Sequence, residues 1–277
     1  MRSTVKPLWL TEMVAVWGYV QRNYFLTKRY FMWEVVWLVY VTMNAMAITY
    51  IGAGAGEFGA GDAAGFMTFL LVGALLWNYM SVLFDVLSET VSWERWEGTI
   101  EYTFMSPSSR ITHLLGMGFY AVVYGIIQTI LTLGVCYLFF DLDLSNANYS
   151  GALLVLAVAS VSLVGFGIVA AVLPLLSPEK GQQVSYIVSS VLLLVSGVYY
   201  EIGVLPGWMQ AVAVFSPVTY ALQGTRAALI EGANLAVLWE DIAPLLVMGV
   251  VFVPLGIFVF RLGERYAKKT GKLKRSG

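Results

Sequence analysis

The strongest constraint on the fold is a series of apolar runs, each near the length that a helix needs to cross a bilayer. A helix rises ~1.5 Å per residue and the hydrocarbon core is ~30 Å thick, so about 20 apolar residues suffice. Six such runs cover residues 31–52, 66–91, 112–140, 150–173, 182–200 and 242–260. Hydrophobic residues make up 59% of the chain and charged residues 12%, about half the charged share of a soluble domain. The sequence therefore predicts an all-α polytopic membrane protein with six transmembrane helices.

Two further segments are apolar but do not have the pattern of a membrane span. In residues 1–30, apolar side chains recur at three- and four-residue spacing, at Leu8, Trp9, Met13, Val16, Trp17, Val20 and Tyr24. This pattern favours an interfacial amphipathic helix, and the alternative is a soluble helix packed on a partner. Residues 201–239 are interrupted by Pro206, Gly207, Pro217, Gly224 and Gly232. They are interpreted as two short re-entrant helices on the outer side, buried among the other helices.

The positions of basic residues predict how the chain crosses the membrane. If the N-terminus is cytoplasmic, 15 of the 16 Lys and Arg residues lie inside and only Arg226 lies outside. Because Lys and Arg concentrate in cytoplasmic loops, we expect both termini, including a basic tail at 263–277, on the cytoplasmic side of the cell (inner) membrane. The transmembrane domain then spans residues 31–262, with the 93–109 loop inside and the 201–239 segment outside.

The 93–109 loop interrupts two apolar runs with an unusual density of charge, at Glu94, Arg95, Glu97 and Glu101. Gly98 is expected to end the helix that descends from the second span, and Thr99 to cap a new short helix. Ile100 and Phe104 are four residues apart and share one face of that helix, which stops at Pro107. Such a face can occupy a hydrophobic groove of another protein. The alternative is a solvated turn between two spans.

A few polar side chains fall within the spans, namely Glu34, Asn44, Asn78, Asp85 and Gln128. Polar and ionisable residues at such positions are functional candidates. Because the acids lie near the cytoplasmic ends of their spans, we favour a structural or gating role over proton transfer. With one histidine, one cysteine and no G-x-x-x-x-G-K-[ST] motif, the sequence indicates no catalytic, metal or nucleotide site.

Two motifs resemble a known family. Glu94-Arg95-Trp96-Glu97-Gly98-Thr99-Ile100-Glu101, followed by Ser106-Pro107 and Arg110, is similar to the cytoplasmic loop of type-2 ABC exporter permeases. Ser216-Pro217-Val218-Thr219-Tyr220, with Arg226 six residues later, resembles a segment before the last span in the same family, although Ser216 replaces the usual asparagine.

The resemblance implies a permease subunit of an ATP-driven exporter, with ATP and Mg²⁺ bound by a partner and no cofactor on this chain. The implied partners are two copies of an ATP-binding subunit, a second copy of this chain or a homologous permease, and membrane lipid, but no nucleic acid. A drug, lipid or other amphipathic substrate is favoured; the alternatives are a polysaccharide or lipid-linked glycan, and an ATP-independent channel or membrane assembly protein. The residues implied to couple transport to the ATPase are Glu94, Arg95, Glu97, Gly98, Thr99, Ile100, Glu101, Phe104 and Pro107.

The second motif implies a gating or re-entrant role for Pro217, Thr219, Tyr220 and Arg226. As the only outward basic residue, Arg226 is expected to pair with Glu201, Glu231 or Glu240 and so to hold the re-entrant helices. The alternative is a contact with an acidic substrate.

Overall fold

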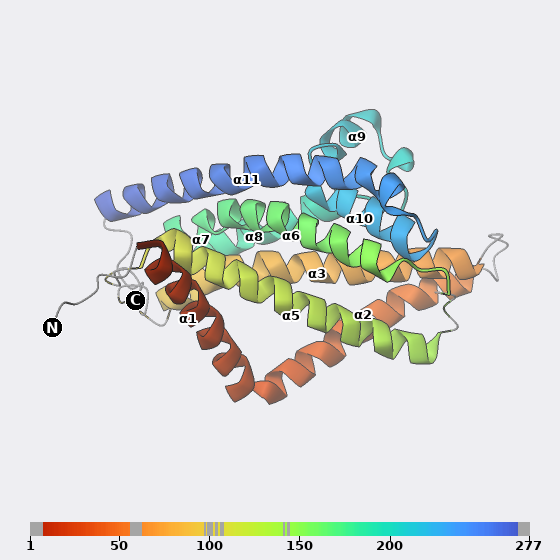
Figure 1. Cartoon of the computed structure of the whole chain (residues 1–277), viewed down its shortest axis with the longest axis horizontal. Helices are drawn as coiled ribbons and strands as arrows, with labels where there is room; N and C mark the ends of the chain where they lie inside the picture. The colour runs from red at the N-terminus through yellow and green to blue at the C-terminus, as the bar shows by residue number, and fades with distance from the viewer. Residues whose placement is uncertain are drawn as a thin grey trace.

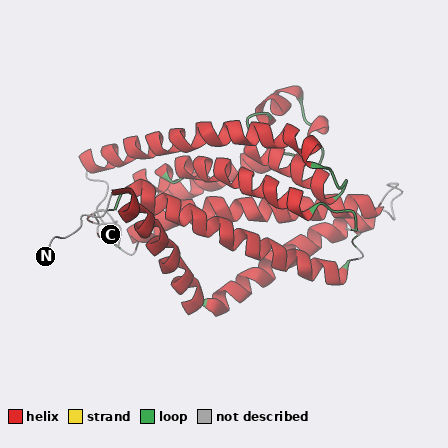
Figure 2. Cartoon of the chain, in the orientation of Figure 1, coloured by secondary structure: helices red, strands yellow, loops and turns green. Residues whose placement is uncertain are grey.

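A computed structural model describes residues 8–55, 63–96, 98, 102, 105, 108–140, 142 and 145–270. Every regular element in these ranges is helical (Figures 1 and 2). The long helices are α1 (Leu8–Arg29), α2 (Phe31–Ala55), α3 (Ala63–Trp96), α5 (Arg110–Phe139), α6 (Tyr149–Ala170), α8 (Pro178–Val195) and α11 (Leu235–Lys269). The shorter ones are α7 (Val172–Leu176), a 3-10 helix (Ile202–Val204), α9 (Gly207–Ala213) and α10 (Pro217–Leu229).

Five of the described helices are long and apolar enough to cross a membrane, at Phe31–Gly54, Ala64–Glu94, Arg110–Phe139, Tyr149–Leu176 and Leu235–Lys269. The predicted span at 182–200 corresponds to α8, whose apolar part, Gln183–Val195, is shorter than these five. The chain is therefore an all-helical protein with several membrane-crossing helices, and the sixth span stays a prediction.

Local sequence signals explain where several helices begin. Ser109 caps α5 by accepting a hydrogen bond from the backbone N–H of Thr112 at 3.1 Å. Asn234 caps α11 in the same way, so this helix begins seven residues before the predicted apolar span at 242–260. Pro178 and Pro217 occupy the first turns of α8 and α10, where a missing backbone N–H costs nothing.

Helix α3 is the centre of the bundle. In its apolar window 72% of the residues are buried inside the protein, against 22% for both α5 and α11. Tyr79, Leu83 and Leu87 follow each other at four-residue spacing on α3 and are fully buried. The hydroxyl groups of Tyr79 and of Ser160 on α6 are hydrogen-bonded, so the central polar group is satisfied.

Helices α6 and α11 pack closely because glycines lie between them. A Cβ atom on Gly256 would lie 2.5 Å from the carbonyl oxygen of Gly165, and one on Gly165 would lie 2.6 Å from the backbone nitrogen of Val253. Small residues allow such backbone approach between helices in membranes, where dispersion contacts replace the hydrophobic effect as a driving force. This pair of helices forms the wall of the bundle opposite α1 and α2 (Figure 1).

Helix α1 packs against α5 with its polar residues, whereas its apolar residues face outward. Tyr19 is hydrogen-bonded to Ser108 at 2.8 Å, and Thr27 to Tyr120. Met13 and Trp17 are exposed. The apolar face is thus available to lipid or to another protein, and the interfacial position of this helix stays a prediction.

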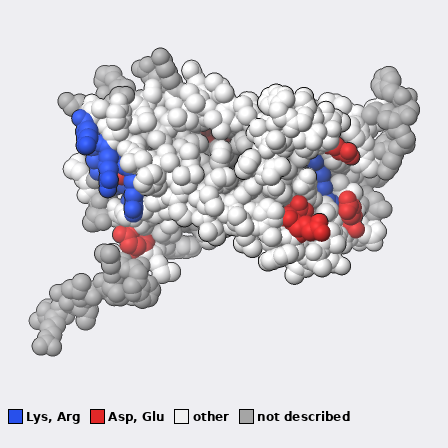
Figure 3. Space-filling view, turned by 90° about the horizontal axis from the view of Figure 1, so that it is seen from above, with Lys and Arg blue, Asp and Glu red and all other residues white. Residues whose placement is uncertain are grey.

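The two ends of the bundle differ in charge. The left end of Figure 1 contains the starts of α1 and α5 and the ends of α3 and α11. On the face shown in Figure 3, Lys and Arg side chains form a strip at this end, and most of the visible acidic side chains lie toward the other end.

Candidate functional site

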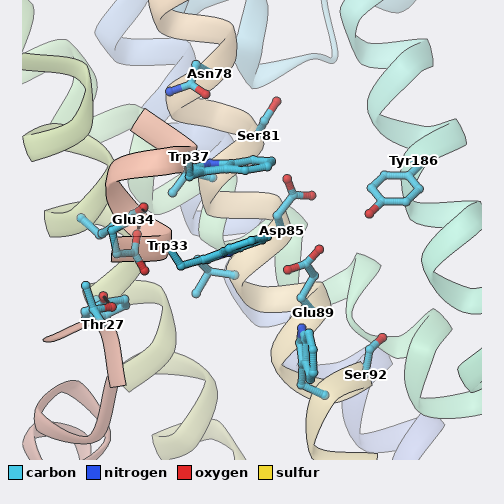
Figure 4. Close-up of a pocket in the computed structure, with 15 residues that line it drawn as sticks. Thr27, Trp33, Glu34, Trp37, Asn78, Ser81, Asp85, Glu89, Ser92 and Tyr186 are labelled. Carbon is cyan, nitrogen blue, oxygen red and sulfur yellow. Dashed lines mark hydrogen bonds between the residues drawn. The ribbon is translucent and has the colours of Figure 1, made fainter. Parts of the chain in front are cut away.

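A cavity of about 800 Å³ opens between α2, α3, α5 and α8 (Figure 4). Three of the five polar residues singled out in the spans line it, namely Glu34 from α2 and Asn78 and Asp85 from α3. Its volume lies in the range of small-molecule sites in proteins, roughly 300–1,000 Å³. The cavity therefore brings three of the five polar residues of the spans together.

Helix α3 contributes a continuous polar stripe to the cavity. Asn78, Ser81, Asp85, Glu89 and Ser92 recur at three- or four-residue spacing, so they lie on one face of the helix. Ser81, Glu89 and Ser92 were not among the predicted site residues. The spacing of polar residues within a span is the sequence signal that could have identified them.

The other walls are largely aromatic. Trp33 and Trp37 come from α2, Tyr120 and Tyr124 from α5, and Tyr186 from α8. Figure 4 shows the Asp85 and Glu89 carboxylates directed away from α3 into the space that Tyr186 faces from α8. From the sequence, aromatic residues in a membrane protein are expected at the membrane–water interfaces. Sequence spacing alone does not reveal that these five residues from three helices line one cavity.

Glu34 is held in place by a tyrosine. The Tyr124 hydroxyl donates to the Glu34 carboxylate at 2.5 Å, and the rings of Tyr120 and Tyr124 stack with centroids 5.9 Å apart. Glu34 therefore accepts a hydrogen bond at the boundary of the cavity, and α2 is joined to α5 at this point.

The remaining two polar residues of the spans lie elsewhere. Asn44 is on the outward face of α2 and donates to the Tyr40 carbonyl of its own helix at 2.8 Å. Gln128 on α5 is only 4% exposed, and neither its amide oxygen nor its amide nitrogen has a hydrogen-bond partner in the described part of the protein. The two side chains are not part of the cavity.

Glu94, at the end of α3, is buried and bonded inside the protein. It is 4% exposed, its carboxylate accepts from Arg22 of α1 at 2.9 Å, and it lies 3.3 Å from the Nε2 atom of His113 on α5. Glu94 thus joins three helices, a contact that the sequence analysis did not anticipate. Arg110, at the start of α5, lies 3.7 Å from Glu264 of α11.

The described residues of the 93–109 loop show where α3 stops and what the loop exposes. Helix α3 ends at Trp96, and Gly98 has a φ of 74°, a left-handed conformation that glycine adopts at little cost. Tyr102 and Met105, three residues apart, are 74% and 73% exposed. The other predicted coupling residues of the loop lie outside the described residues, namely Glu97, Thr99, Ile100, Glu101, Phe104, Pro107 and the side chain of Arg95.

Arg226 on α10 binds backbone carbonyls. It donates to the oxygens of Gly197 at 2.9 Å, Val198 at 2.6 Å and Phe69 at 3.4 Å, and its guanidinium carbon lies 3.5 Å from the centre of the Phe69 ring. None of the acids in the described ranges lies within ion-pair distance of it, so the expected pairing with Glu201, Glu231 or Glu240 is not found. Burial lowers the pKa of Arg226 to about 10, opposed in part by the charge of Glu201, and at neutral pH the guanidinium stays protonated.

The other residues of the second motif lie on the same helix as Arg226. Pro217 and Thr219 are buried, Tyr220 is partly buried, and the Thr219 hydroxyl has no partner among the described residues. These positions hold α10 against the bundle. None of them lines the cavity.

The ABC-2 type transporter family matches this chain over residues 15–230. A search among curated proteins finds no match. The matched region includes α2, α3, α5, the cavity between them, the 93–109 loop and the Arg226 contact. The chain therefore belongs to the ABC-2 type transporters, as a multi-span membrane permease that carries no ATPase of its own.

Proposed function

We propose that this chain is the permease subunit of an ATP-driven exporter, which moves an amphipathic molecule from the cytoplasm or inner leaflet outward. One observation carries the proposal: the same helix, α3, forms the polar wall of the cavity and ends in the 93–109 loop. A force applied to this loop reaches Asp85 and Glu89 through one continuous helix. ATP and Mg²⁺ are bound by two partner subunits.

The distribution of charge supports a cytoplasmic position for the 93–109 loop and both termini in the cell (inner) membrane. The Lys and Arg strip of Figure 3 lies at the end of the bundle where α1 starts, α3 ends and α11 ends. Basic residues are typical of the cytoplasmic side. With α8 as the sixth span, the 201–239 segment lies outside and its short helices α9 and α10 form the re-entrant part.

The contact with the ATP-binding subunit is proposed to include Tyr102 and Met105 together with the predicted Ile100 and Phe104. The first two are large apolar side chains, three residues apart and exposed at the proposed cytoplasmic end. Such side chains are suited to a hydrophobic groove. Glu94 is buried and contacts Arg22 of α1 and His113 of α5, so its proposed part in the coupling is to pass motion of α3 to these two helices.

A second copy of the chain is proposed to cover part of α2. Asn44 lies on the outward face of this span, where its amide hydrogen-bonds only its own helix among the described residues. An amide facing lipid is unfavourable, and across a helix–helix contact it can hydrogen-bond a partner. The α2 face that includes Asn44 is thus the proposed contact between copies.

Co-expression of the chain with a candidate ATP-binding subunit tests the proposal. The two chains should co-purify. In inside-out membrane vesicles, whose lumen corresponds to the outside of the cell, ATP hydrolysis by the complex should drive accumulation of the substrate in the lumen. Replacing Tyr102 and Met105 with serine should reduce transport per ATP hydrolysed, whereas Tyr149→Ser, an exposed tyrosine in the first turn of α6, serves as the matched control. If the double variant assembles and transports like the unaltered protein, the loop does not transmit the motion.

A further inference from the structure

The described lining of the cavity contains acidic but no basic side chains. Of its fifteen described residues three are acidic, Glu34, Asp85 and Glu89, and none is Lys or Arg. Asp85 and Glu89 are one turn apart on α3, a spacing at which like charges repel each other. In the described part of the protein no basic side chain lies within ion-pair distance of Asp85.

Three basic residues from α1 and α5 contact other acids. Arg22 and His113 contact Glu94, and Arg110 lies beside Glu264. An acidic side chain within an apolar span is energetically costly, and such residues mark pathways for substrates or ions. Asp85 therefore requires a positive partner that the described residues do not supply.

The shape and chemistry of the other walls indicate what that partner is. Trp33, Trp37, Tyr124 and Tyr186 give the cavity flat aromatic surfaces. Aromatic faces attract organic cations through the negative potential above the ring, and the attraction is stronger where the cation is desolvated. A small metal ion would be surrounded by oxygen ligands in a tight shell, and the described residues contain no group of acids, histidines or cysteines suited to hold one.

We propose that this cavity binds an organic cation with an apolar or aromatic body, such as a protonated amine or a quaternary ammonium or phosphonium compound, as the transported substrate. Asp85 and Glu89 provide the charge, and Trp33 and Trp37 cover the apolar body. An acidic lipid or glycan is repelled by the same carboxylates. The assignment of this ligand as substrate rests on the proposed export function, but binding itself does not.

Binding of radiolabelled tetraphenylphosphonium to the purified chain in detergent tests the charge preference. Saturable binding is expected, and tetraphenylborate, an anion of the same shape, should neither bind saturably nor compete. Since this comparison uses the unaltered protein, it does not depend on how a variant folds. Equal binding of the two ions would overturn the proposal, because it would mean that the cavity recognises shape and hydrophobicity without charge.

Variants locate the site. Asp85→Asn or Glu89→Gln should weaken tetraphenylphosphonium binding by about tenfold, equivalent to about 1.4 kcal/mol. Glu231→Gln, which removes an exposed acid outside the cavity, should leave the affinity unchanged. If Glu231→Gln weakens binding as much as the cavity variants do, the effect is one of overall charge and the site is wrong.

The cation proposal and the export proposal fail in different ways. A chain that stimulates its ATP-binding partner and drives transport, but binds no tetraphenylphosphonium, contradicts only the substrate class. A chain that binds tetraphenylphosphonium through Asp85, but neither assembles with an ATP-binding subunit nor transports, contradicts only the export function.

Discussion

Replacing Arg226 with lysine should destabilise the protein although the charge is kept. The guanidinium bridges α10 to the turn after α8 through Gly197 and Val198, and to α3 through the carbonyl and ring of Phe69. A lysine ammonium has no planar fork and cannot serve all three carbonyls while stacking on the ring. The loss of one charge-assisted hydrogen bond costs roughly 1.5–3 kcal/mol, and the weaker stacking adds about 1 kcal/mol.

A total loss of about 3 kcal/mol corresponds to a decrease in Tm of roughly 6–12 °C for a chain of this size. Thermal unfolding in detergent, followed by tryptophan fluorescence, measures it. Arg261→Lys is the matched control, because Arg261 is an exposed arginine on α11, and its Tm should stay within about 1 °C of the unaltered protein. If Arg226→Lys unfolds at the same temperature as this control, the carbonyl contacts do not hold α10, and the arginine is maintained for another purpose, such as contact with an acidic substrate.

Three further substitutions test separate contacts. Glu94→Gln should lower the free energy of unfolding by about 1–3 kcal/mol, the cost of weakening a buried charged contact. It should also make α1 more sensitive to limited proteolysis. Unchanged proteolysis would show that α1 is held by its other contacts. Gly256→Val should lower the free energy of unfolding by about 1–3 kcal/mol through overpacking against α6. The control is Gly134→Val, at a position with no neighbouring atom within 4 Å, which should leave stability unchanged. Equal melting temperatures of the two variants would refute the close packing. Gly98→Val places a β-branched residue at a φ of 74°, which costs about 1–3 kcal/mol. The variant should insert into the membrane but transport less substrate per ATP hydrolysed in the complex. An unchanged ratio of transport to ATP hydrolysis would show that the break after α3 is not needed.

The helices themselves could be predicted from the sequence because their signals are local. Apolar length located all five helices that are long enough to cross a membrane, and a local serine, Ser109, caps α5. The predicted spans and the helices differ mainly at their ends. Helix α11 continues to Lys269, because an apolar window stops at the first charged residues, whereas Arg, Glu, Ala and Lys are all good helix formers.

The orientation of side chains could be predicted only in part. In a soluble protein an apolar face indicates the core, but in a membrane protein lipid and core are equally apolar. For α1 the apolar stripe therefore indicated a surface, while the residues that fix α1 to the bundle, Tyr19, Arg22 and Thr27, are polar and contact positions 72 to 93 residues away. For Glu94, charge density suggested exposure, and only the tertiary structure places Arg22 and His113 beside it.

The polar stripe of α3 is the exception, and it explains why the cavity and the 93–109 loop belong together. Within a span, polar residues on one helical face indicate a surface that contacts neither lipid nor apolar core. On α3 this face extends from Asn78 through Asp85 to Ser92, and the helix ends one turn later at Trp96, before the left-handed Gly98. Because the opposite face carries the fully buried Tyr79 and its neighbours, α3 cannot bend toward the core without breaking close packing. In the proposed coupling, a displacement of the loop therefore moves the polar face relative to α2 and α8 and changes the size of the cavity.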